Sequence, residues 1–155
     1  WDSKKALEAL REIPKAMVCD ALMDQTIFAG SGNIIKNEVL FNLELHPEAR
    51  VGALSSAQQR ALVKEVHSYS HRFYEWKKVG QLKRNWRIFR KKVCPRCHVP
   101  VKKRQTGKLE RFSHYCTSCQ LRPQLKPQSK AAMRLTPGRK RPSSTGDSSS
   151  RRLRH

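Results

Sequence analysis

Four cysteines stand in two pairs of the same form. Cys94 and Cys97 make one C-x2-C pair, Cys116 and Cys119 make the other, and 18 residues separate the pairs. Four thiolates at this spacing are typical of a tetrahedral structural zinc site that closes a short hairpin. Two disulfides are the alternative. A basic chain with no recognisable secretory signal is expected in a reducing compartment, however, where disulfides are rare. The sequence therefore predicts zinc.

Other residues that could bind a metal are assigned simpler roles. His98 and His114 lie beside the cysteines, and we expect them to face solvent or DNA because four thiols already complete a site. His67 and His71 have the i, i+4 spacing of a metal pair, but no third ligand accompanies them, so surface or core-seam positions are expected. Cys19 is expected to pack as a small hydrophobic residue.

The stretch IFAGSGNIIKNEVLF, residues 27–41, places two glycines and an asparagine between apolar runs. A dinucleotide-binding loop would need a third glycine where Ile35 stands. A plain turn between helices explains Gly30 and Gly32 as residues that tolerate positive φ. It does not explain Asn33 at the start of the next helix. The amide of Asn33 and the free N–H groups of the first turn would together bind a phosphate, favoured by the helix dipole.

Positive charge gathers in the second half of the sequence. Lys and Arg exceed Asp and Glu by 33 − 12 = 21 residues. Residues 1–80 hold 11 basic and 10 acidic side chains, whereas residues 81–155 hold 22 basic and 2 acidic ones. This imbalance indicates a polyanionic partner, with nucleic acid as the first candidate. An acidic membrane surface is the weaker one, because no suitable basic amphipathic helix is found. The sequence contains no run of about 18 apolar residues, so it predicts no membrane-spanning helix.

The elements that must position these groups are predicted to be mostly helical. A first helix, capped by Asp2 or Ser3, precedes a largely buried helix that begins at Pro14. A third helix follows the glycines and runs to about Leu45. Ser55 caps a long fourth helix that Gly80 ends. Its apolar residues recur at spacings of three and four and predict one seam facing a core: Leu62, Val66, Tyr69, Phe73 and Trp76.

The pattern changes after Gly80. Residues 85–93 alternate bulky and basic side chains and predict an extended strand. Residues 94–119 predict a hairpin that turns at QTGK, residues 105–108. From about Gln120 the chain is rich in Pro, Ser, Lys and Arg, so we expect it to be disordered.

Two segments resemble one known family. DALMDQTIFAGSGNIIKNEVLF, followed by LHPEARVGALS, is similar to the helix-two-turn-helix motif of the formamidopyrimidine-DNA glycosylase and endonuclease VIII family. The four-cysteine hairpin resembles that family's zinc finger, and the similarity covers roughly residues 14–120 in the family's order. The resemblance implies a mainly α fold in three parts. These are a helical helix-two-turn-helix DNA-binding domain (1–80), a zinc-finger β-hairpin (81–120) and a disordered basic tail (121–155).

The resemblance also implies base-excision repair, in which a damaged base is removed and the abasic strand is cleaved. In this family a loop asparagine grips the phosphate beside the extruded nucleotide. A finger arginine five residues before the third cysteine holds the phosphates around the lesion. Asn33 and Arg111 stand at these positions. Gly32 and Lys36 complete the predicted DNA-binding set, although Lys36 replaces a frequent aromatic or aliphatic residue and could equally be a solvated side chain. The expected partner is double-stranded DNA with damaged bases or abasic sites, bound by a monomer.

Catalysis in this family starts from an N-terminal proline followed by glutamate, whereas this chain begins with Trp1 and Asp2. We therefore expect the DNA-holding half of a DNA glycosylase/AP lyase, with no catalytic residue in this chain and little turnover by it alone. The expected location is the bacterial cytoplasm, at the nucleoid, or the nucleus of a eukaryote. The alternative from another class is a non-enzymatic zinc-containing nucleic-acid-binding module.

Overall fold

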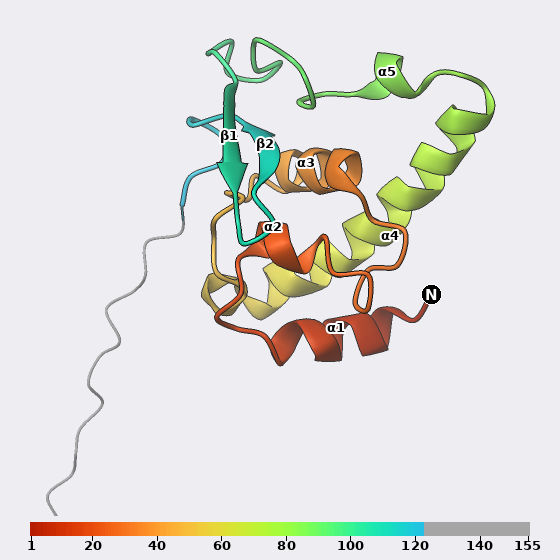
Figure 1. Cartoon of the computed structure of the whole chain (residues 1–155), viewed down its shortest axis with the longest axis vertical. Coiled ribbons are helices and arrows are strands. Elements are labelled where there is room, and N and C mark those ends of the chain that lie inside the picture. Colours follow the sequence, from red (N-terminus) through yellow and green to blue (C-terminus); the bar gives the residue numbers. More distant parts are fainter. Residues whose placement is uncertain (123–155) are drawn as a thin grey trace, which may run out of the picture. The chain divides into compact units, whose positions relative to one another are not determined.

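The computed structural model describes residues 1–122 (Figure 1). The predicted disordered tail, residues 121–155, lies outside the described residues except for its first two. The elements follow one another as α1 (Ser3–Arg11), α2 (Val18–Ala21), α3 (Asn33–Asn42), the 3₁₀ turn η1 (Val51–Ala53), α4 (Ser56–Lys78), α5 (Leu82–Asn85), β1 (Lys102–Thr106) and β2 (Arg111–Tyr115). The prediction of a mainly helical chain with a β-hairpin is confirmed for this part. None of the helices described is long and apolar enough to span a bilayer.

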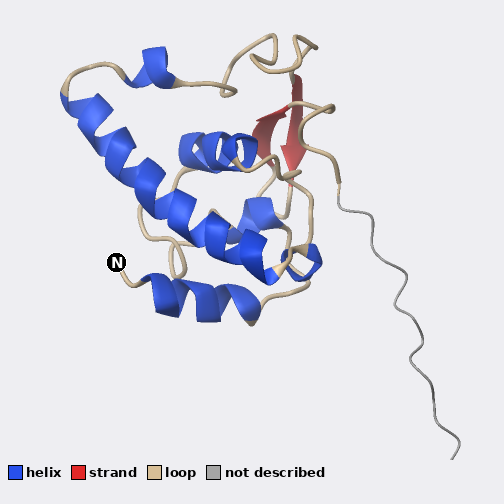
Figure 2. Cartoon of the chain, turned by 180° about the vertical axis from the view of Figure 1, so that it is seen from behind, coloured by secondary structure: helices blue, strands red, loops and turns tan. Residues whose placement is uncertain are grey.

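Helix α4 is the centre of the helical part. It packs against α1 on one side and α3 on the other, as both views show (Figure 2). The predicted seam of α4 faces this core: Leu62, Val66 and Tyr69 are buried, and Phe73 and Trp76 are half-buried against it. Burial of this apolar stripe stabilises the fold by roughly 2 kcal/mol for each fully buried side chain.

Two helix starts have the caps that the sequence predicts. The carboxylate of Asp2 accepts the backbone N–H groups of Lys4 and Lys5 at 2.9 and 3.2 Å. Ser55 and Gln58 form a reciprocal capping box at the start of α4. Each cap satisfies N–H groups that have no partner inside the helix.

The prediction of a second helix that begins at Pro14 is wrong in extent. Only Val18–Ala21 is helical, because the backbone before it pairs with a later segment. The N–H of Gly52 donates to the carbonyl of Pro14 at 2.9 Å, and the N–H of Val18 donates to the carbonyl of Ala49 at 2.8 Å. Gly52 approaches Pro14 so closely that a Cβ at Gly52 would lie 3.0 Å from it.

Helix α3 ends at Asn42, before the predicted Leu45. Glu44 adopts a left-handed φ of 57°. The N–H of Leu45 then donates to the carbonyl of Leu40 at 2.9 Å, and that of Glu44 donates to the carbonyl of Phe41 at 3.2 Å. This pair of bonds is a Schellman motif, which closes the helix and returns the chain toward the core.

The predicted strand over residues 85–93 is not formed. The short helix α5 ends at Asn85, and the next residues fold into a loop whose N–H groups bind a buried carboxylate on α3 instead of a neighbouring strand. The hairpin itself is antiparallel, with its register running from Lys102 opposite Tyr115 to Thr106 opposite Arg111. Its turn lies at residues 107–110, about two residues later than predicted, and Gly107 supplies the required positive φ of 74°. Strand β2 packs against α3.

Candidate metal centre and nucleic-acid interface

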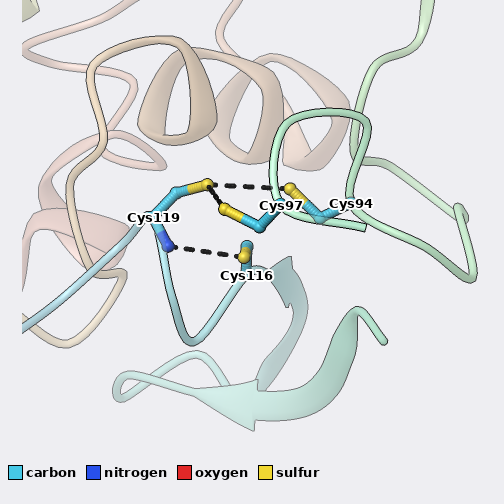
Figure 3. A group of neighbouring side chains, drawn as sticks. All are labelled: Cys94, Cys97, Cys116 and Cys119. Atoms are coloured by element: carbon cyan, nitrogen blue, oxygen red, sulfur yellow. Dashed lines mark hydrogen bonds between the residues drawn. The ribbon is translucent and has the colours of Figure 1, made fainter. Parts of the chain in front are cut away.

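The four paired cysteines converge on one point. Their Sγ atoms all lie within 4.8 Å of one another. The Sγ atom of Cys119 is 3.6 Å from that of Cys94 and 2.8 Å from that of Cys97 (Figure 3). Sulfurs bound to one tetrahedral zinc at about 2.3 Å would be about 3.8 Å apart, so the cluster needs only small adjustments to hold the ion. None of the four forms a disulfide, and four sulfur donors of this kind suit zinc.

Tight turns within each pair bring the thiols together. The N–H of His98 donates to the carbonyl of Cys94 at 3.0 Å, with His98 at a φ of 57°, and the N–H of Cys119 lies 3.4 Å from the Sγ of Cys116. Burial raises the pKa of the Cys94 thiol, but the backbone N–H groups of Cys97 and Arg96 outweigh it and lower that pKa to about 7. Burial and hydrogen bonds with the neighbouring thiols raise the pKa of the Cys119 thiol instead, so metal binding would release protons from the cluster.

The cluster is anchored to the C-terminal end of α3. Cys94 and Cys116 pack with Phe41 and Ile88 in a second small core. The guanidinium of Arg96 lies 4.1 Å from the centre of the Phe41 ring and donates to the Phe41 carbonyl at 2.9 Å. A cation at the C-terminal end of a helix satisfies free carbonyls and complements the helix dipole.

The glycine loop before α3 differs in one respect from the prediction. Gly30 has a positive φ of 83°, but Gly32 is extended, at φ −119°, and serves as the N-cap of α3. Gln25 holds the loop, because its side chain accepts the N–H of Gly30 at 2.9 Å and donates to the carbonyl of Ser31 at 2.8 Å.

Asn33 is the first helical residue of α3 and is half-buried. The first helical hydrogen bond runs from the N–H of Lys36 to the carbonyl of Gly32 at 2.9 Å, which leaves the N–H groups of the first turn without helical partners. The Oδ1 atom of Asn33 is buried without a hydrogen-bond partner, whereas its Nδ2 atom is at least partly exposed and donates to no group within residues 1–122. The amide can therefore present its N–H groups to an anion outside the protein.

Lys36 is buried, with 1% of its surface exposed, so the alternative prediction that its side chain is solvated is wrong. Its Nζ atom lies 3.4 Å from the carbonyl of Phe112 on β2. Burial, with a smaller effect from the nearby Arg111 guanidinium, lowers the pKa of the Lys36 amine to about 8. The amine thus faces the hairpin backbone. A contact between Lys36 and DNA stays a prediction.

Arg111 is exposed at the start of β2, close enough to Lys36 to act on its charge. The residue after it, Phe112, supplies the carbonyl that the first turns of α3 approach. The structure therefore brings the N-terminal end of α3, with Asn33, against the end of the hairpin that carries Arg111. Their roles in DNA binding, like that of Gly32, stay predictions.

The remaining candidates have structural environments. Cys19 is buried in the core, as predicted, and His98 is exposed. The prediction that His114 faces solvent or DNA is wrong, because His114 is buried and its ring lies 5.0 Å from that of Phe89. His67 and His71 approach within 3.3 Å through their Nε2 atoms at the surface of α4.

Sequence reasoning missed three polar residues that hold this site together. Glu38 and Asn37 are buried on α3 and bind the backbone of other elements. Asp20 accepts the N–H of Lys108 with both carboxylate oxygens at 3.0 Å and so fixes the tip of the hairpin. The signal for the first two was a run of polar residues, KNE, inside an otherwise apolar helix.

Comparison with known proteins identifies relatives of this chain. Residues 2–82 match the family described as the formamidopyrimidine-DNA glycosylase H2TH domain. The chain is 37% identical to endonuclease 8-like 3 of Bos taurus over 105 residues, which are 67% of this chain and 17% of that protein. It is 38% identical to endonuclease 8-like 2 of Mus musculus over 123 residues, which are 78% of this chain and 36% of that protein.

Solved structures also match much of this chain. Lactococcus lactis formamidopyrimidine-DNA glycosylase, non-covalently bound to DNA that contains an AP site, aligns with a TM-score of 0.70 and 27% sequence identity. The alignment covers 78% of this chain and 46% of that one. The chain thus spans less than half the length of each of these proteins.

Proposed function

The chain belongs to the formamidopyrimidine-DNA glycosylase and endonuclease VIII family, and from this membership we propose that it is the DNA-holding part of a bifunctional base-excision-repair enzyme. The observation that carries the proposal is the junction of α3 and β2, where a helix N-terminus with Asn33 meets the strand that begins with Arg111. Asn33 and Arg111 would bind the backbone of one DNA strand beside a damaged or abasic nucleotide.

The physical task of this part is to offset the cost of base extrusion. A base inside a duplex must leave the stack before it can be excised, at a cost of a few kcal/mol. Phosphate contacts from two elements hold the distorted backbone without reading its sequence. Excision of the base and cleavage of the abasic strand would be activities of the whole enzyme.

We propose that Cys94, Cys97, Cys116 and Cys119 hold a structural zinc, which supplies no step of the reaction. Its effect is to close the hairpin, because a segment this small has little core of its own and gains its folding free energy from the metal. The closed hairpin in turn keeps Arg111 at the end of α3. Cysteines kept as metal ligands fit a reducing compartment, such as the bacterial cytoplasm or the eukaryotic nucleus, where disulfides are rare.

The test is the affinity of the 155-residue chain for a duplex with a stable abasic-site analogue, measured at several salt concentrations. Arg111→Ala is expected to weaken binding and to reduce the salt slope by about 0.9, because one phosphate is no longer neutralised. Asn33→Ala is expected to weaken binding with the slope unchanged, because an amide carries no charge. The matched control is Arg11→Ala, an exposed arginine on α1, which packs on the side of α4 away from α3. Unchanged affinity in both Asn33→Ala and Arg111→Ala would refute the proposal.

A second measurement tests the assignment of catalysis to another part of the enzyme. Borohydride reduces a Schiff base between an amine and an abasic site to a stable adduct. The 155-residue chain is expected to bind abasic DNA without being trapped on it, because the two proposed contacts, an amide and a guanidinium, are not nucleophilic amines. Efficient trapping of the folded chain would show that it carries a nucleophile of its own.

A further inference from the structure

Asn37 is a buried amide at the junction of α3 and β2, with 1% of its surface exposed. Its Nδ2 atom donates to the carbonyl of Asn33 at 2.7 Å and lies 3.4 Å from the carbonyl of Phe112. Its Oδ1 atom accepts the N–H of His114 at 2.6 Å. One side chain therefore uses its donors and its acceptor to join two elements that are 75 residues or more apart in the sequence.

The partners of Asn37 are the backbones of the proposed phosphate-binding residues or of their neighbours. The carbonyl of Asn33 belongs to the first proposed contact itself. Phe112 directly follows Arg111, the second contact. Within residues 1–122, no backbone–backbone hydrogen bond joins α3 to β2, so side chains make the polar link between them. Lys36 adds a second donor to the Phe112 carbonyl, also at 3.4 Å.

We propose that Asn37 is a positioning residue that sets the distance between Asn33 and Arg111, so that both bind the same DNA strand at once. The inference rests on the proposed function and deepens it. Without this link, each contact would have to be ordered separately when DNA binds, and the loss of conformational freedom would weaken binding. With it, the two contacts act as one unit, and their contributions to affinity are coupled.

A second buried amide provides the matched control. Gln120 donates to the carbonyl of Leu45 at 2.9 Å and accepts the N–H of Cys116 at 2.9 Å. Like Asn37 it joins the helical part to the hairpin region and is buried. It does so beyond the C-terminal end of α3, at the cysteine cluster, and contacts neither Asn33 nor a neighbour of Arg111. Its removal should destabilise the protein without changing the coupling.

The experiment is a double-mutant cycle of Asn33→Ala and Arg111→Ala on affinity for a duplex with an abasic-site analogue. It is carried out in the 155-residue chain and in its Asn37→Ala and Gln120→Ala variants. In the unaltered chain we expect the double variant to depart from the product of the single effects by about fivefold or more. This coupling should fall below about twofold with Asn37→Ala and should persist with Gln120→Ala.

Asn37→Asp is the second variant, because it keeps nearly the same volume and the acceptor for His114 but loses both donors. It should also abolish the coupling, and its extra charge cancels within each cycle. Should neither variant fold, the unaltered chain decides by NMR: DNA should slow exchange of the Asn37 side-chain amide protons, and Arg111→Ala should remove this effect.

Several results would overturn the proposal. The first is that the coupling between Asn33 and Arg111 survives in a folded Asn37 variant. The second is that this coupling falls equally with Gln120→Ala. The third is that DNA leaves the exchange of the Asn37 side-chain amide protons unchanged. A different failure identifies the proposed function as wrong: neither Asn33→Ala nor Arg111→Ala would then weaken binding even in the unaltered chain.

Discussion

Glu38 offers the sharpest test of how the fold is held together. It lies inside α3 with none of its surface exposed. Its Oε1 atom accepts the N–H groups of Ile88 and Phe89 at 2.9 and 2.8 Å, and its Oε2 atom accepts the N–H of Arg87 at 2.9 Å. These three bonds hold the loop that leads into the first cysteine pair. The informative change is Glu38→Gln, which preserves shape but removes the charge and one acceptor.

The magnitude follows from these bonds. In Glu38→Gln the remaining side-chain oxygen can still accept two of the three N–H groups. The new NH2 group is itself a donor, so the third backbone N–H is left without an acceptor. A buried unpaired N–H costs about 1–3 kcal/mol, and the two remaining bonds lose their ionic character. We expect a loss of about 3 kcal/mol in the free energy of unfolding. Glu38→Ala leaves all three donors unpaired and adds a cavity, so it should cost more, roughly 5 kcal/mol.

Urea unfolding followed by circular dichroism measures this loss, with metal release to a chelator as a second readout of loop order. The control is Glu65→Gln on α4, whose carboxylate pairs with Arg72 at 2.7 Å near the surface. Such a pair contributes only about 0.5 kcal/mol. If Glu38→Gln cost no more than Glu65→Gln, the carboxylate would not be what holds the loop, and this account of the fold would be wrong.

Three further predictions concern burial, backbone geometry and the metal. Burial lowers the pKa of Lys36 to about 8, so above that pH the unfolded chain binds more protons than the folded chain. The free energy of unfolding of the unaltered chain, relative to that of Lys36→Met, should therefore rise by up to about 3 kcal/mol between pH 8 and 10.5. Denaturant titrations measure this rise. Gly107→Ala should cost about 2 kcal/mol by the same method, because φ is 74° and the new Cβ would lie 2.1 Å from an oxygen of Asp20; adding Asp20→Ala should relieve part of that cost. Metal analysis should find about one zinc per chain and clearly less in Cys116→Ser, and a chelator should abolish the NMR signals of the ordered hairpin.

Local signals predicted the elements whose stability is local. Asp2 and Ser55 start helices because their side chains satisfy N–H groups two or three residues away, which a short window of sequence contains. The seam of α4 was predictable because a period of three and four residues is a property of one helix. The C-x2-C pairs likewise identified the cysteine cluster. The predictions of the second helix and of the strand over residues 85–93 were wrong because the backbone groups of these segments bind distant partners. The partners of the first lie on the segment after Pro47, and the partner of the second is Glu38.

The sequence by itself determined the chemistry of this protein: four thiols suited to one metal, an excess of positive charge, and an asparagine at the start of a helix. Only the tertiary structure decided that α3 and β2 meet, that Lys36 is buried beneath the hairpin and that Asn37 joins the two proposed phosphate contacts. The reason is physical. Residue types set which bonds a side chain can make, but burial and packing of segments 75 residues apart set which partners are within reach.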